Sequence, residues 1–415
     1  MSSNIVRDES VSQPVGALAA WRYPAFRLYF TGQLVSVTGT WMQAVAQQIV
    51  VFNLTHSEFA LGLVAAAQGL PALILSPFAG VIVDRYPKRR LLIITQSLMM
   101  VLAFVMAWLY FVNQLQVWHI VALSLGLGVA NALDAPARQA FVVEMVGHPA
   151  LSSGVVMNSM MFNSARVIGP AVGGIALYTL GAGWCFFLNG ASFLAVIVSL
   201  LLMRVVERPF LTGRIAIIGP LKEGFAFARS HPTIRPLLLL AASASLFTST
   251  FATLIPAFAS QILHDTTEGT SALYTAQGLG AALAALLVAR MTNTGRRGTL
   301  LGYVALSAPL FVIAFSLTRS YVTALPVVGF AGLTGIAQFI LMNTLIQNEV
   351  PDEYRGRVMA LYTLTFFGLS PFSNLAIGVL AQWTSTPFAI GLYGVVALVC
   401  AAAIFWRAPQ LWRLR

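Results

Sequence analysis

The chain has 415 residues, of which 58% are hydrophobic and only 9% are charged. About 25% of the residues in an average soluble domain are charged, so this composition excludes a protein whose main solvent is water. The net charge of +11 would suit a nucleic-acid partner, but the basic residues are spread over many short polar segments. We therefore expect an integral membrane protein whose partner is the lipid bilayer and which binds no nucleic acid.

Twelve nearly uncharged segments recur along the chain, each close to the length of about 20 residues with which a helix crosses about 30 Å of hydrocarbon. Their hydrophobic residues run continuously and do not alternate with polar ones, which favours helices over a β-barrel. The segments comprise residues 28–52, 60–83, 91–112, 117–143, 151–180, 184–205, 237–263, 270–289, 299–317, 322–346, 358–383 and 388–406.

The longest polar interval divides these spans into two sets of six. We predict an all-α integral membrane protein in which residues 28–205 and 237–406 form two six-helix bundles, joined by a cytoplasmic linker at 206–236. Residues 1–27 and 407–415 are predicted to be cytoplasmic tails. The first apolar run is too long for a cleaved signal peptide, so we expect it to remain in the protein as the first membrane span. In alternating access, two such bundles rock against each other around a binding site near the midplane of the bilayer.

The basic residues predict how the spans are oriented. If the N-terminus is cytoplasmic, all but three of the 24 lysines and arginines fall in cytoplasmic segments. The exceptions are Arg319 in an outer loop and Arg138 and Arg166 within spans. This distribution follows the positive-inside rule, so both termini are predicted to face the cytoplasm.

The loop after span two reads Gly80-Val-Ile-Val-Asp84-Arg85-Tyr-Pro-Lys-Arg89-Arg. Gly80 would let a neighbouring helix approach closely, and Asp84 could interact with the positive N-terminal end of another helix. The alternative is that the basic residues only orient the spans. The loop resembles the signature of the major facilitator superfamily, G-x-x-x-D-R-x-x-R/K-R/K, although Pro87 stands where that signature usually has glycine.

This resemblance implies a latch between conformations. In the superfamily, the acid of the loop contacts span eleven, and its bases contact an acid at the end of span four and hold the outward-facing state. Carried over residue by residue, Gly80, Asp84, Arg85 and Arg89 would form the latch, with Glu144 as the candidate acid of span four.

Two spans of the N-terminal half carry charged residues in their interior. In span four, Asp134 and Arg138 are four residues apart on one helix face and can neutralise each other. In span five, Asn163 precedes Arg166, which lies near the bilayer midplane, where a lone charge costs at least about 2.5–3.5 kcal/mol. We predict that these four residues couple proton and substrate, with Asp134 as the counter-ion of Arg166. The alternative is a purely structural pair between the two spans.

Span five continues with Gly169-Pro170-Ala-Val-Gly173-Gly174. Small residues at this spacing let helices pack closely, and a proline inside a helix bends it. The segment resembles the G-P-x-x-G-G element on the fifth span of superfamily exporters, which implies a bending point. The alternative is an ordinary glycine packing face.

Three further segments narrow the resemblance. They are Gly39-Thr-Trp41-Met-Gln43, Pro136-Ala-Arg-Gln-Ala-Phe, and the stretch from Asn343 through Val-Pro-Asp-Glu-Tyr-Arg355-Gly-Arg357. Together they are similar to the drug:proton antiporter branch that includes enterobactin exporters and macrolide efflux proteins. The resemblance implies a monomer in the bacterial inner membrane that exports a bulky amphiphile, siderophore-like or drug-like, in exchange for protons.

In the superfamily, spans one, four, seven and ten line the central cavity. The residues this implies here are Trp41, Gln43 and Gln47 of span one and Gln338 and Asn343 of span ten. For each of them, hydrogen bonding or packing between helices is the alternative, because buried amides in lipid seek partners.

Other chemistry is excluded or left open. The chain has no phosphate-binding loop and no hydrolase motif, so we expect neither an ATP-driven pump nor an enzyme. Cys185, Cys400 and the five histidines have no metal-ligand spacing, so no metal or cofactor is expected. For the proton, Asp134 is the first candidate, followed by Glu144 and Glu58. Rival functions are an importer or lysolipid transporter of the same fold, and a non-transporting sensor or scaffold.

Overall fold

The computed structural model describes residues 18–147, 149–203, 218–264, 268–291 and 295–414. All regular elements in these ranges are helices. The N-terminal half begins with a short 3-10 helix, η1, and continues through six long helices. Their bounds are η1 (Ala19–Arg22), α1 (Pro24–Thr55), α2 (Glu58–Arg85), α3 (Lys88–Phe111), α4 (Val117–Val146), α5 (Leu151–Leu180) and α6 (Ala182–Leu202).

The C-terminal half begins with the linker helix α7 (Ile218–Ser230) and contains two broken spans. The seventh span passes from α8 (Ile234–Ser243) through the π-helical turn η2 (Ala244–Thr248) and the 3-10 turn η3 (Thr250–Leu254) into α9 (Ile255–Ile262). The eleventh consists of α13 (Asp352–Gly368) and α14 (Ser370–Trp383). The remaining elements are α10 (Glu268–Met291), α11 (Arg297–Leu317), α12 (Tyr321–Glu349), α15 (Thr386–Arg407) and η5 (Pro409–Arg413).

Local chemistry explains where several helices begin and end. The Ser57 side chain accepts a hydrogen bond from the Ala60 N–H at 3.3 Å, which caps the first turn of α2. Gly147 and Gly181 follow α4 and α5 with positive φ angles of 66° and 88°, a backbone region that favours glycine. The connections that result are short, so consecutive helices of each half run antiparallel.

Eleven of the described helical segments are long and apolar enough to cross a membrane, with α8–α9 and α13–α14 each counted as one segment. The 32-residue α1 is not among them, because its glutamine, serine and threonine side chains lower its hydropathy. It nevertheless packs along α5 and α6 within the same bundle. The predicted all-α membrane fold is confirmed.

The hydrophobic cores show how the two halves meet. The largest core contains buried residues of both halves, such as Phe52 and Leu177 of the first and Phe258 and Ile377 of the second. Another core contains residues of the C-terminal half alone, and two contain residues of the N-terminal half alone. The shared core lies where α2 begins and α5 ends, and we call this the junction end. The opposite end, where α1 begins and α15 ends, is the separate end.

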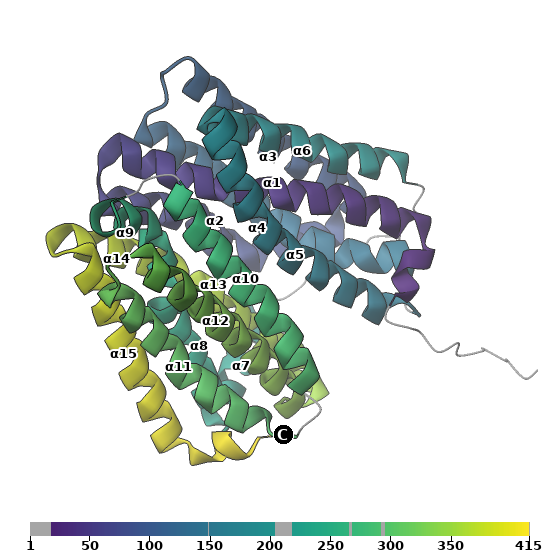
Figure 1. Cartoon of the computed structure of the whole chain (residues 1–415). Helices are drawn as coiled ribbons and strands as arrows, with labels where there is room; N and C mark the ends of the chain where they lie inside the picture. Colours follow the sequence, from purple (N-terminus) through teal and green to yellow (C-terminus); the bar gives the residue numbers. More distant parts are fainter. Residues whose placement is uncertain (1–17, 148, 204–217, 265–267, 292–294, 415) are drawn as a thin grey trace, which may run out of the picture.

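Figure 1 shows the two bundles in contact at the junction end and diverging towards the end that carries the C-terminus. Two helix pairs join the halves: α2 packs along α14, and α5 packs along α10. Glycine permits this approach, because a Cβ atom at Gly62 would collide with the backbone of Asn374, and one at Gly174 would collide with Ser271. The halves therefore share one tightly packed end.

Candidate functional site

The basic loop between α2 and α3 makes its described contacts within the N-terminal half. Arg89 donates through Nε and Nη2 to the carbonyl oxygens of Leu200 and Leu201 at 2.7 and 2.9 Å. These carbonyls lie in the last turn of α6, where a positive charge is favourable. Lys88 Nζ lies 3.5 Å from Glu144 Oε1 at the end of α4. Glu144 was predicted to be the acid of the latch, whereas Lys88 was not among the predicted latch residues.

The other latch residues are not engaged in this conformation. Arg85 is exposed, and Asp84 has no hydrogen bond or ion pair among the residues whose side chains the structure describes. A Cβ atom at Gly80 would meet nothing within 4 Å. The expectation that Gly80 lets a neighbouring helix approach is therefore not met here, because the bundles are apart at this end. As a latch, these residues stay a prediction for another conformation.

Asp134 lies in a buried polar cluster between α3 and α4, with 1% of its surface exposed. Its Oδ1 accepts hydrogen bonds from Thr95 Oγ1 at 2.8 Å and from Gln96 Nε2 at 2.9 Å. Its Oδ2 lies 2.6 Å from Arg138 Nε, close enough for an ion pair, although the angle is not that of a hydrogen bond. Arg138 also lies over the Phe162 ring at 4.7 Å. The charge on Asp134 is thus balanced inside its own helix.

Arg166 does not contact Asp134, which corrects the expected counter-ion. Its guanidinium lies 5.4 Å from the centroid of the Trp41 ring, a cation–π distance. Among the side chains that the structure describes, it has no ion pair with a carboxylate. Arg138, four residues along the same helix and also predicted to neutralise Asp134, is the arginine that lies beside it. The side chain of Asn163 lies outside the described residues.

The glycine-rich segment of α5 explains why Arg166 reaches Trp41. Gly169 faces Trp41 so closely that a Cβ atom would collide with its side chain, and a Cβ atom at Gly173 would lie in tight contact with Met42, 3.1 Å from its Cα. Gly174 points instead towards Ser271 of α10 in the other half. Pro170 is buried inside α5, which continues through it. One short segment therefore fits α5 against both its own bundle and the partner bundle.

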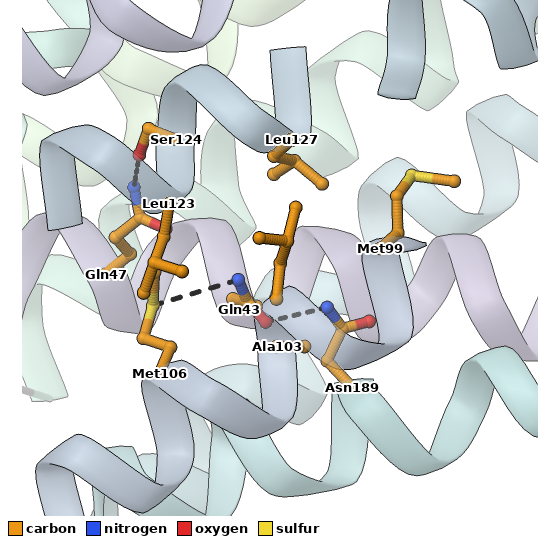
Figure 2. Close-up of a pocket in the computed structure, with 10 residues that line it drawn as sticks. Gln43, Gln47, Met99, Ala103, Met106, Leu123, Ser124, Leu127 and Asn189 are labelled. Carbon is orange, nitrogen blue, oxygen red and sulfur yellow. Dashed lines mark hydrogen bonds between the residues drawn. The ribbon is translucent and has the colours of Figure 1, made fainter. Parts of the chain in front are cut away.

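Gln43 and Gln47 lie inside the N-terminal bundle, as Figure 2 shows, which corrects their assignment to a cavity between the halves. Gln43 accepts a hydrogen bond from Asn189 Nδ2 at 2.7 Å, and Gln47 donates to Ser124 Oγ at 3.0 Å. They border a small cavity between α1, α3, α4 and α6 that is just large enough for one water molecule.

The two span-ten residues differ from each other. Gln338 of α12 is buried, and its Oε1 has no hydrogen-bond partner. Asn343 is half-buried and accepts a hydrogen bond from Gln347 Nε2 at 2.5 Å. Phe339, between them, lies against Tyr362 and Phe366 of α13. Gln338 therefore has a buried side-chain oxygen that is available to accept a hydrogen bond.

The breaks in spans seven and eleven lie side by side and were not predicted from the sequence. Ser245 donates to the Phe366 carbonyl at 2.5 Å, Thr250 shares a hydrogen bond with Ser373 at 3.0 Å, and Thr253 donates to Asn374 Oδ1 at 3.0 Å. These hydroxyls satisfy polar groups near two interrupted helices, which lipid alone could not do. The signal was the run Ser245-Leu-Phe-Thr-Ser-Thr250-Phe-Ala-Thr253, dense in hydroxyl side chains for a membrane span.

Comparison with known proteins agrees with this architecture. The family of transmembrane secretion effectors matches residues 15–411. The enterobactin exporter EntS of Shigella boydii serotype 18 is 24% identical over 341 residues, which cover 82% of this chain and 81% of the relative. The enterobactin exporter EntS of Escherichia coli O1:K1 shows the same identity and coverage.

Solved structures of other transporters share the fold. A POT family transporter in complex with 5-aminolevulinic acid has a TM-score of 0.77 at 11% identity and covers 94% of this chain and 97% of its own. A bacterial homologue of the human lysosomal transporter Spinster, inward-facing and unoccupied, has a TM-score of 0.67 at 16% identity, with coverages of 94% and 97%. The helical fold, the paired bundles and the family match together show that this chain belongs to the transmembrane secretion effector family of the major facilitator superfamily, whose members are transporters and not enzymes.

Proposed function

We propose that this protein is a secondary active transporter that exports a bulky amphiphilic small molecule, siderophore-like or macrolide-like, by alternating access. The observation that carries the proposal is the distribution of the cores. The two halves share a core at the junction end and have their own cores at the separate end. A carrier that alternates needs two lobes that stay in contact at one end while the other opens.

The charge distribution supports an orientation in which the separate end faces the cytoplasm. Four arginines lie at that end: Arg85 at the end of α2, Arg89 in the first turn of α3, Arg297 at the start of α11 and Arg355 in α13. Basic residues near the ends of spans favour the cytoplasmic side. In this orientation the conformation is open to the cytoplasm, and the names of the EntS relatives favour export.

Arg166 supports an amphiphilic substrate with an acidic or strongly electronegative group. It is half-buried in the middle of α5, and its described partner is an aromatic ring rather than a carboxylate. A cation at this depth is costly unless it has a functional partner. The free acceptor of Gln338 would bind a hydroxyl or amide donor of the same molecule. Trp41 supplies an apolar surface beside the charge.

Proton exchange would use Asp134. Protonation of its carboxylate would remove the negative charge that holds Arg138, and Arg138 would then be free to turn towards the space between the bundles. Loss of the proton would restore the ion pair. Substrate and proton would be exchanged if an acidic group of the substrate competes with Asp134 for Arg138.

The experiment is transport in inside-out vesicles that contain the purified protein, with enterobactin and erythromycin as the two probes. Accumulation should require an acidic lumen, and nigericin should abolish it. Right-side-out vesicles under the same gradient measure the opposite direction. Accumulation only in those would overturn export and favour the importer.

A matched pair of variants tests the non-transporting sensor. Arg166→Ala should abolish flux, whereas Arg235→Ala, which changes an exposed arginine of α8 outside the proposed site, should not. Equal flux in both variants and in empty vesicles would reject transport.

A further inference from the structure

The C-terminal end of the chain folds back onto the start of α11. The backbone N–H of Gly298 donates to the carbonyl oxygen of Leu414 at 3.0 Å, and the Thr299 hydroxyl donates to the carbonyl oxygen of Trp412 at 2.9 Å. Figure 1 shows the C-terminus beside the beginning of α11. A Cβ atom at Gly298 would collide with the Leu411 carbonyl, so the tail lies directly against the helix. Main-chain groups of the tail therefore fix its position.

This fold-back brings arginines from distant parts of the sequence near one another. Arg413 stands between Trp412 and Leu414, whose carbonyls bind the first turn of α11, and Arg296 directly precedes that turn. Arg407 ends α15, one residue before η5 begins. All three arginine side chains are exposed. We call Arg296, Arg407 and Arg413 the basic corner.

The described residues around the basic corner do not neutralise it. The helices α11, α15 and η5 contain no aspartate or glutamate. Within the part of the chain that the structure describes, the three arginine side chains have neither a hydrogen bond nor an ion pair. Glu349 ends α12, which packs along α11, and it forms no ion pair with them either. The three charges are thus available to an anion from outside the chain.

Helix length and aromatic side chains place the basic corner at the level of the lipid head groups. The helices α11 and α15 have 21 and 22 residues. That length is about 30 Å, the thickness of the hydrocarbon core, so their ends lie at its edges. Near these ends Tyr303 and Trp406 are exposed, and the Tyr303 ring meets Trp412 edge-on with 5.8 Å between ring centroids. Such aromatic side chains concentrate at the membrane–water interface.

We propose that the basic corner binds the phosphate of an anionic phospholipid in the leaflet at the separate end. Arginine suits this partner, because its planar guanidinium can donate two parallel hydrogen bonds to phosphate oxygens. The exposed Tyr303 and Trp406 favour a lipid over a soluble phosphate, because acyl chains would lie along them while the head group meets the arginines. The site belongs to one half, so the inference holds whatever the transported molecule and its direction.

Lipid binding is measured with the full chain, purified in detergent and freed of lipid. Phosphatidylglycerol is titrated while native mass spectrometry follows the first bound lipid, with phosphatidylethanolamine as the lipid without net charge. Phosphatidylglycerol should bind more tightly. Arg296→Gln combined with Arg413→Gln should weaken its binding by about tenfold, equivalent to about 1.4 kcal/mol. The bonds that hold the tail do not involve these two side chains, so the fold should be kept.

A matched double variant separates a built site from general attraction to a basic surface. Arg22→Gln combined with Arg27→Gln removes the same charge from exposed arginines of the N-terminal half at the same end, and it should bind like the parent. Equal weakening in the two double variants would overturn the site. It would mean that these arginines only orient the spans.

Two further measurements guard against a folding defect and against a soluble ligand. Arg296→Lys combined with Arg413→Lys keeps the charge and should bind more tightly than the glutamine pair. Equal loss in both pairs would mean that altered folding weakens binding, and the assignment would fall. Glycerol 3-phosphate carries the phosphate without acyl chains and should leave the bound lipid in place. Its displacement of phosphatidylglycerol at equal concentration would reject a lipid in favour of a soluble phosphate.

Discussion

The junction end and the separate end use different chemistry. At the junction end, glycines, serines and amides connect the halves, and neutral donors surround the one described carboxylate, Glu58. At the separate end, ion pairs stay within one half, as in Lys88–Glu144 and Arg357–Glu223, the latter joining α13 to the linker helix α7. Neutral contacts between halves can break without stranding a charge, whereas charged contacts hold each half together as it moves.

The largest expected effect comes from crowding the junction end. A Cβ atom at Gly62 would collide with the backbone of Asn374 and lie against Gly378, none of which can move aside easily. Gly62→Val should therefore hold the junction end apart and reduce transport to background. Gly80→Val at the separate end meets no atom within 4 Å, so the melting temperature should stay unchanged. Equal transport by Gly62→Val and the parent would show that this contact is not needed.

Asp134→Asn tests whether the charges within one half are structural. The change leaves Arg138, whose side chain is 12% exposed, without its anion, which should cost up to about 3–5 kcal/mol. The melting temperature in detergent should fall, and Asp134→Asn combined with Arg138→Gln should recover part of the loss. A double-mutant cycle measures the coupling. No interaction in that cycle would contradict the pairing.

Arg166→Ala separates substrate binding from packing. Loss of one charged contact to substrate should weaken binding by about 1.5–3 kcal/mol, or about 10- to 100-fold. Binding is measured by titrating the probe molecule against the melting temperature. Arg166→Lys keeps the charge and should lose less. If both variants bind like the parent, Arg166 serves only to pack on Trp41.

The smallest effect is expected at the basic segment of the separate end. Lys88→Gln removes one long contact of 3.5 Å to Glu144, whose side chains are 15% and 6% exposed, and should cost about 0.5–1.5 kcal/mol. Arg89→Gln removes two charge-assisted hydrogen bonds to α6 carbonyls and should cost more, about 1.5–3 kcal/mol. Thermal unfolding of the two variants side by side would reveal a reversed order, which would mean that Lys88 is the stronger anchor.

Much of the fold could be predicted because the membrane constrains it. Continuous apolar runs longer than a bilayer's thickness have to be helices, so the all-α fold followed from composition and segment length. The proximity of Asp134 and Arg138 could also be predicted, because residues four apart in a helix lie next to each other on its surface. The breaks in spans seven and eleven were missed, because the carbonyls of Phe366 and Leu246 are satisfied by the hydroxyls of Ser245 and Ser373, which lie more than 100 residues away in the sequence.

The site was predicted less well, because side-chain direction depends on neighbouring helices. Gln43 and Gln47 lie on α1 where a cavity was expected, but Asn189 and Ser124 hold them inside the bundle. Arg166 was assigned to Asp134 and instead lies over Trp41. Lys88, in the same basic loop, contacts Glu144 although it was not counted among the latch residues.

By itself, the sequence determined that this chain is a helical membrane protein, and its motifs indicated the superfamily, because hydrophobic length and local spacing act along one helix at a time. Only the tertiary structure decided which end the halves share, which charges neutralise each other and where Glu58 lies. Those features depend on distances between helices that are far apart in sequence, and packing alone sets those distances.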